Sequence, residues 1–302
     1  MALAVNNNTS AFNVFSNYSN NIGKMRTSMS RLSSGVKSVT DDPSGLGISE
    51  RMRSQIRSTG MSRQNVENGL SMLQTADSWM QKMNDMLGRM HELGVEAGDG
   101  TKTSSDLNNI QSEFKELQSE IKRITDGSTS AAKYNGLYLF RGGDGRTVND
   151  TTKGLSIQIG ADVGQKIKID LKQLDSNTTN TETLTYDKAD GSTGTMKWGS
   201  VISSDSHLSV RSDDSLGKIS AAIDHISDSR ATLGAQQNRL KETQSGLLSY
   251  EDNLRAAESK VRDVDMASES TKFSKFQILS QISNAMLAQA NQLPSSALQL
   301  LG

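Results

Sequence analysis

Residues 219–261 read ISAAIDHISDSRATLGAQQNRLKETQSGLLSYEDNLRAAESKV, and apolar side chains recur in them at a fixed interval of seven. A seven-residue repeat holds one apolar stripe against a partner along a left-handed supercoil. This stretch therefore predicts a long helix that packs lengthwise against other helices. The repeating residues are Ile219, Ile226, Leu233, Leu240, Leu247, Leu254 and Val261.

Both ends of the chain carry apolar stripes with steps of three and four residues, which are typical of helices. A large side chain that becomes buried contributes about 1.5–3 kcal/mol, whereas each ordered residue costs about 1–2 kcal/mol. We therefore expect that neither terminal helix is stable alone and that the two pair with each other. Pro294 should kink or restart the second helix. The stripes are Ala11, Phe15, Tyr18, Ile22, Met25, Met29, Leu32 and Val36, and Phe276, Leu279, Ile282, Met286, Ala290, Leu293, Ala297 and Leu300.

Two more helices are expected in the first half of the chain. One begins at Pro43, whose fixed φ suits the first helical position, with Asp42 as its N-cap, and ends at Gly98 to Gly100. The other spans about residues 105–126. Their apolar stripes are Leu73, Ala76, Met80, Met83, Leu87 and Met90 in the first, and Leu107, Ile110, Phe114, Leu117, Ile121 and Ile124 in the second.

The apolar period changes to two in the middle of the chain, which predicts a β-hairpin at about residues 154–172. Its alternating residues precede and follow a turn at residues 160–165. Residues 175–209 are rich in Ser, Thr, Asn, Asp and Gly and predict a small surface-exposed excursion. A weaker hairpin signal within it joins residues 183–187 to residues 195–198.

The composition favours long helices over a compact globule. Only 34% of the residues are hydrophobic and 4% aromatic, whereas an average soluble chain is about 45–50% apolar. Helices that bury one narrow stripe need fewer apolar residues. The predicted fold class is mostly α: an elongated, hairpin-shaped helical bundle or coiled coil with paired N- and C-terminal helices and a small β-hairpin region in the middle.

Charge and targeting patterns exclude several classes of protein. The net charge is −1 and the basic residues are scattered, so the electrostatic footprint of a nucleic-acid-binding protein is missing. No apolar run approaches the ~20 residues that span a bilayer, and residues 1–30 lack the pattern of a signal peptide. The absence of cysteine excludes disulfides and thiolate chemistry.

Several motifs near both ends resemble the bacterial flagellin family, in the order and spacing that the family shows. Near the start stand LSSG (32–35), DDPSG (41–45) and IS (48–49). Toward the end stand LGAQQNRL (233–240), VRDVDMASE (261–269), QANQLP (289–294) and LQLL (298–301). The resemblance covers nearly the whole chain, and the short middle makes it similar to a nearly minimal member.

The resemblance implies a structural subunit that polymerises into the filament of the bacterial flagellum, which drives swimming motility. It implies export, unfolded and uncleaved, through the flagellar type III secretion channel, and an extracellular location in the flagellum. The implied partners are other copies of the chain, an export chaperone, and the filament cap and hook-junction proteins. The expected polymerisation seam is Phe15, Tyr18, Ile22, Met25, Met29, Leu32, Leu279, Ile282, Met286, Leu293 and Leu300.

The expected domains follow the same pairing of the two ends. Residues 1–42 with 262–302 are expected to form a terminal coiled-coil core domain that is disordered in the monomer. Residues 43–174 with 210–261 are expected to form a helical rod domain, and residues 175–209 the surface excursion.

A further resemblance concerns recognition by a host. Arg89 and Leu93, together with Glu113 on the next helix, are similar to the surface by which animal flagellin-sensing Toll-like receptors recognise the family. The alternative is that these residues serve subunit packing only.

Motifs that would carry other chemistry are incomplete. His91 and Glu92 resemble the start of a zinc protease motif, but Val95 stands where the second histidine is needed. Residues 142–145, of sequence GGDG, lack the ligand spacing of a phosphate loop or calcium site. His207 and His225 have no neighbouring ligand in the sequence. We expect no enzyme activity, cofactor or metal.

Two other functions remain open at this stage. A hook-to-filament junction protein shares the helical termini but is used in few copies, and the ending QLP with the seven-residue repeat favours flagellin over it. A secreted coiled-coil effector or adhesin need not have complementary apolar ends.

Overall fold

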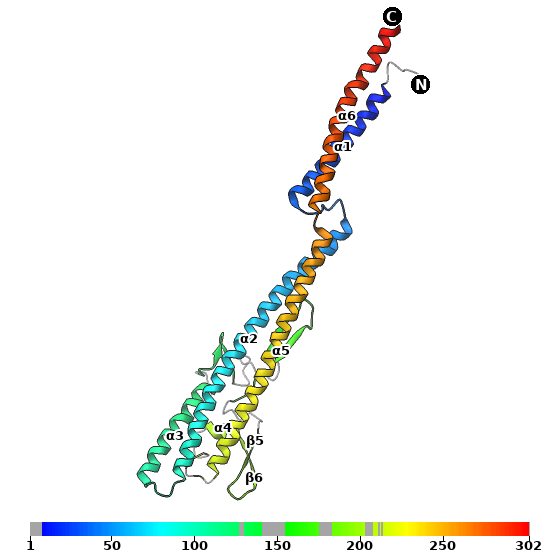
Figure 1. The fold of residues 1–302 in the computed structure, drawn as a ribbon. Coiled ribbons are helices and arrows are strands. Elements are labelled where there is room, and N and C mark those ends of the chain that lie inside the picture. Colours follow the sequence, from blue (N-terminus) through cyan, green and yellow to red (C-terminus); the bar gives the residue numbers. More distant parts are fainter. Residues whose placement is uncertain are drawn as a thin grey trace. The chain divides into compact units, whose positions relative to one another are not determined.

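The computed structural model of the chain divides into two compact units (Figure 1). One unit comprises residues 1–56 with 252–302, and the other comprises residues 57–251. The structure describes residues 8–126, 130–140, 155–174, 183–202, 208–210, 212 and 214–301, without the side chains of residues 293–301.

Helices make up most of the described chain, as the sequence predicts. The long helices are α2 (Pro43–Ala97), α3 (Ser104–Thr125) and α5 (Ser215–Arg262). The six predicted core residues of α2, from Leu73 to Met90, are completely buried, and four of the six in α3 are buried. The hydrophobic core of unit 57–251 forms where these stripes meet. Four methionines of α2 pack within this core, namely Met72, Met80, Met83 and Met90.

The predicted ends of the helices agree with the structure. Pro43 is the first residue of α2, and the Asp42 carboxylate accepts a hydrogen bond of 2.8 Å from the Gly45 amide, which confirms the N-cap. The helix ends at Ala97, directly before the expected glycines. Thr103 caps α3 through reciprocal hydrogen bonds with Asp106.

The α5 repeat is buried only over part of its length. Its first four members, from Ile219 to Leu240, are at most 2% exposed, while Leu247, Leu254 and Val261 are half-buried. Within unit 57–251, Arg230 of α5 forms an ion pair of 2.8 Å with Asp77 of α2. In this unit the first four repeat residues of α5 are therefore buried, and an ion pair also joins α5 to α2.

In the part of the chain that the structure describes, three antiparallel hairpins accompany the helices. The predicted hairpin is β3 (Leu155–Gln158) with β4 (Lys166–Ile169), which pairs Leu155 with Ile169. A second joins β5 (Thr183–Asp187) to β6 (Thr193–Lys197) through an exposed turn in which Gly191 has a φ of 77°. A third hairpin, β1 (Lys133–Tyr134) with β2 (Leu137–Tyr138), was not predicted.

The described part of residues 175–209 is not confined to the surface. Trp198, Val201 and Ile202 of α4 (Trp198–Ile202) lie in the hydrophobic core. Buried Gln118 of α3 donates a hydrogen bond of 2.9 Å to the Val201 carbonyl and holds α4 in place. The sequence did not predict this burial, because residues 175–209 are mostly polar and Trp198, Val201 and Ile202 are few among them.

Unit 1–56 with 252–302 is built around two antiparallel helices, α1 (Thr9–Ser34) and α6 (Met266–Leu301), which run side by side (Figure 1). This arrangement confirms the predicted pairing of the terminal helices. The helix α6 is continuous through Pro294, so it does not restart there. Among the described residues, no helix combines the length and the apolar character needed to cross a bilayer.

Candidate functional site

Polar contacts fix the antiparallel register of α1 and α6. Asn8 donates a hydrogen bond of 2.8 Å to the Ala290 carbonyl, and Asn21 donates one of 3.3 Å to the Ser283 hydroxyl. At the other end of the pair, Arg31 contacts Glu269. These contacts place one defined face of each helix against the other.

The structure separates the predicted N-terminal stripe into two sets. Tyr18, Met25 and Leu32, seven residues apart, are half-buried on the side toward α6. Phe15 and Met29 belong to the other set and are 55% and 52% exposed. Ile22, between them in that set, is half-buried.

The same separation occurs on α6. Ser283 and Ala290 are buried against α1, and Leu279 is half-buried. Ile282 and Met286 are 52% and 54% exposed, and four-residue spacing places them on one face with exposed Ile278. The side chains of the remaining predicted seam residues, Leu293 and Leu300, lie outside the described residues.

The exposed apolar side chains of the two helices make up a set that the single chain leaves uncovered. We call it the open stripe and define it as Phe12, Phe15 and Met29 of α1 with Ile278, Ile282 and Met286 of α6. Large side chains that are half exposed on consecutive turns are typical of a surface that another helix covers.

A short backbone contact joins the connector that follows α1 to the connector that precedes α6. Residues 35–41 and 262–265, which we call the clasp, meet at a β-bridge between Val36 and Asp263. The Lys37 amide donates to the Arg262 carbonyl and the Val264 amide to the Gly35 carbonyl, at 2.9 and 3.0 Å. Gly35 caps the end of α1 with a φ of 71°. A residue with a side chain would be strained in this left-handed conformation.

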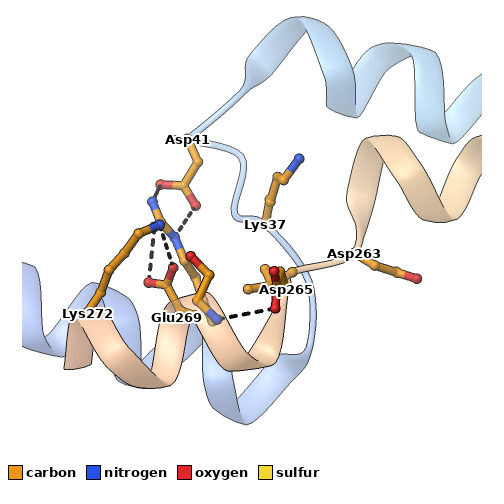
Figure 2. A pocket seen from close by; sticks show the side chains of 9 residues that line it. Lys37, Asp41, Asp263, Asp265, Glu269 and Lys272 are labelled. Carbon is orange, nitrogen blue, oxygen red and sulfur yellow. Dashed lines mark hydrogen bonds and ion pairs between the residues drawn. The ribbon is translucent and has the colours of Figure 1, made fainter. Parts of the chain in front are cut away.

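An ion-pair network reinforces the clasp. Figure 2 shows Asp41, Glu269 and Lys272 converging beside the connectors. Arg31 binds both oxygens of Asp41, at 2.7 and 3.0 Å, and one oxygen of Glu269 at 3.2 Å. Lys272 binds the other Glu269 oxygen at 3.1 Å. The Glu269 side chain is only 3% exposed, so its charge depends on these two cations.

The network shifts the pKa of both carboxyl groups downward. The hydrogen bond from Arg31, with those from Ser38, lowers the pKa of Asp41 to about 2. Burial raises the pKa of Glu269, but hydrogen bonds from Ser28 and Lys272 and the charge of Arg31 outweigh it, so the net shift is also downward. Both groups are therefore ionised at neutral pH.

The clasp borders a recess of about 380 Å³ whose lining mixes cations and carboxylates. Arg31 and Lys272 pair with Asp41 and Glu269, and the Lys37 ammonium donates to the Val261 carbonyl, so these groups hold the connectors together. Sequence reasoning assigned Asp42 correctly as a cap but missed the role of Asp41, because its partners Arg31 and Glu269 show no periodic signal. The lining residues are Arg31, Lys37, Asp41, Asp263, Val264, Asp265, Ser268, Glu269 and Lys272.

The second predicted site lies in unit 57–251. Arg89 of α2 reaches Glu113 of α3 at 2.8 Å and Glu92 at 3.0 Å, and the hydrogen bonds to Glu113 and then Glu92 raise its pKa. Leu93 is 1% exposed and packs in the core. Only Arg89 and Glu113 of the three predicted residues therefore present side chains at the surface.

The incomplete motifs gain no support from the structure. Among the described residues, no three acidic or histidine side chains are arranged to share a metal ion. The ring of His225 lies 5.8 Å from that of Trp198, centroid to centroid, at an angle of 38°, as part of the packing near α4. Residues 142–145 and His207 lie outside the described residues.

Comparisons with known proteins match both halves of the chain. Residues 5–144 match the model of the bacterial flagellin N-terminal helical region, and residues 216–301 match that of the C-terminal helical region. A flagellin of Bacillus subtilis is 38% identical over 99% of this chain and all of its own length. A flagellin of Halalkalibacterium halodurans is 35% identical over the same shares. A flagellar filament 33 kDa core protein of Treponema phagedenis is also 35% identical, over 99% of this chain and all of its own.

Proposed function

This chain belongs to the bacterial flagellin family, and from that premise we propose that its copies assemble through the open stripe of α1 and α6. As a member of this family of structural proteins, it is a subunit of the flagellar filament, which lies outside the cell. The observation that carries the proposal is the half exposure of four predicted seam residues, Phe15, Met29, Ile282 and Met286.

The energetics favour a second copy as the occupant of the stripe. Burying the exposed half of one large apolar side chain contributes roughly 1 kcal/mol. Six such side chains on one subunit give several kcal/mol before ordering costs are subtracted. In a filament the same contact must form between each subunit and the next. A homopolymer supplies an identical partner for every such contact.

Seeded polymerisation tests this assignment. Purified chain added to short filament seeds should extend them, as seen by electron microscopy and by the protein that sediments. If the chain stays soluble in the presence of seeds at every chain concentration tested, polymerisation is refuted as its function.

The proposal extends to export and to partners. The apolar residues are spread along thin helices and no disulfide constrains the chain, which suits passage in an unfolded state through the flagellar type III channel. Export chaperone, filament cap and hook-junction proteins complete the proposed partners. In a strain whose flagellar export channel is inactivated, the chain should remain in the cells and be missing from the medium.

Proteolysis of the monomer tests the proposed domains. Residues 1–42 and 262–302 should be cut first, because the open stripe leaves them short of apolar contacts. A fragment from about residue 40 to about residue 260 should resist and can be identified by mass spectrometry. If the peptide bonds near Phe15 and Leu287 in a verified monomer resist cleavage as well as those between residues 40 and 260, the terminal domain is not disordered.

Acid should release subunits as the clasp carboxylates become protonated. The folded-state pKa values of Asp41 and Glu269 lie below the ordinary values of about 4. Their pairing therefore stabilises the ordered form fully above that range, and this stabilisation is lost as pH falls toward 2.

Removing the shared cation should shift this transition. Arg31→Met raises both pKa values, so its filaments should release subunits about 1 pH unit above the wild type. Sedimentation across a pH series measures the midpoint. Arg26→Met, an exposed residue of the same helix, is the control and should leave the midpoint in place. Coincident midpoints for Arg31→Met and wild type would show that the clasp does not set acid stability.

The receptor surface is a proposal for the soluble subunit. Arg89→Glu replaces the cation between Glu113 and Glu92 with a third carboxylate. We expect at least a tenfold weaker response of cells that express a flagellin-sensing Toll-like receptor. Arg123→Glu is the matched control, since Arg123 is also exposed and paired with a glutamate on its own helix. If both variants retain full potency, subunit packing is the role of Arg89.

A further inference from the structure

Methionine is the only sulfur-containing residue of this chain, which has thirteen methionines and no cysteine. Their exposure differs widely. Met80, Met83 and Met90 are completely buried, which shields their thioethers from oxidants. Four others are about half exposed or more, at 49–60%, namely Met29, Met61, Met266 and Met286.

Two of these four lie on the open stripe. Met29 belongs to the same set as Phe15 in α1, and Met286 is one turn from Ile282 in α6. Met266 is just as exposed but is the first residue of α6, at a position whose helical phase differs from that of Ile278, Ile282 and Met286. Met61 lies in the other unit. Met29 and Met286 are therefore an exposed pair on the open stripe, and Met61 and Met266 are an exposed pair outside it.

We infer that Met29 and Met286 form an oxidation site that blocks assembly when a peroxide converts their thioethers to sulfoxides. The inference rests on the proposed assembly through the open stripe. The sulfur lone pair attacks one peroxide oxygen, an S–O bond forms and the O–O bond breaks. The departing oxygen takes a proton and leaves as water when the oxidant is hydrogen peroxide. The sulfur is oxidised by two electrons and the peroxide is reduced by two.

The sulfoxide is incompatible with an apolar contact. Oxidation turns a flexible apolar side chain into a polar one with a strong acceptor oxygen. The other members of the open stripe are Phe12, Phe15, Ile278 and Ile282, whose side chains have no hydrogen-bond donors. A buried acceptor that lacks a donor opposes the contact. The oxidised chain should therefore need at least a tenfold higher concentration to extend seeds.

The same geometry makes the site sensitive only before assembly. In the single chain both thioethers face solvent, whereas a neighbouring copy that covers the stripe shields them. Free subunits should lose the ability to assemble under peroxide, while finished filaments keep Met29 and Met286 reduced.

The experiment compares three chains before and after hydrogen peroxide. They are the wild type, the Met29→Leu plus Met286→Leu variant, and the Met61→Leu plus Met266→Leu variant. Mass spectrometry measures sulfoxide at each methionine, and seeded polymerisation gives the critical concentration. Each chain is its own reference, through the ratio of that concentration after and before treatment.

We expect a ratio of at least ten for the wild type and the Met61/Met266 variant, and a ratio near one for the Met29/Met286 variant. Methionine sulfoxide reductase should restore the treated wild type. A wild type that assembles normally with sulfoxide at both positions would overturn the inference, and so would an equal ratio for all three chains. Untreated wild type that fails to extend seeds would instead refute the proposed function.

Assembled filaments provide an independent test. Peroxide applied to filaments should leave Met29 and Met286 largely unmodified compared with the same treatment of monomers. Equal modification at these two positions in monomer and filament would show that no copy covers the stripe, and would overturn the inference.

Discussion

A chain that lacks residues 286–302 should fail to extend filaments. The deletion removes Met286 from the open stripe and Ala290 from the contact with α1, including the hydrogen bond that Asn8 donates. The first half of α1 then has no partner for most of its apolar residues. Seeded extension should fall by at least a hundredfold, since several apolar contacts of roughly 1 kcal/mol are lost together.

The rest of the fold should survive this deletion. The hydrophobic core of unit 57–251 contains no residue from the deleted segment. Circular dichroism should show a soluble helical monomer whose main unfolding transition is unchanged. Long, shear-resistant filaments from the truncated chain would mean that contacts outside the terminal helices drive assembly.

A single charge on the open stripe should have nearly as large an effect. Ile282→Asp places a carboxylate where the proposed partner brings apolar side chains, and an unpaired buried charge costs several kcal/mol. Because Ile282 is 52% exposed in the single chain, the monomer should fold normally. The critical concentration for seeded extension should rise at least a hundredfold, and motility should be lost.

Asn284→Asp is the matched control for this substitution. It adds the same charge to the same helix at an exposed position two residues away, off the open stripe. It should assemble within a few-fold of the wild type. If Ile282→Asp and Asn284→Asp are equally impaired, net charge and not the stripe governs assembly.

Periodic burial was the part of this fold that could be predicted from sequence. The stripes of α2 and α3 and the first half of the α5 repeat are buried as their spacing indicates. The start of α2 at Pro43 and the existence of the β3–β4 hairpin also follow from local rules about proline and alternating side chains. These signals depend only on residues close together in the chain, so they can be recognised in a single sequence.

Contacts between residues distant in sequence could not be predicted in this way. Arg31 and Glu269 are 238 positions apart, and neither belongs to an apolar repeat. A repeat also does not specify which of its two sets faces which partner. The terminal stripe therefore predicted Phe15 and Tyr18 equally, whereas the structure exposes the first more than the second.

The turn between β5 and β6 has a practical consequence. It is exposed, it closes with a Lys188 amide bonded to the Ser192 carbonyl at 2.9 Å, and Gly191 supplies its left-handed residue. Exposed turns of small polar residues accept insertions, and doubling the length of a loop costs only about 0.6 kcal/mol. A foreign peptide inserted between Asp190 and Gly191 would be carried once by every subunit. A polymer of such subunits would be a vaccine scaffold whose epitope density is set by the subunit repeat.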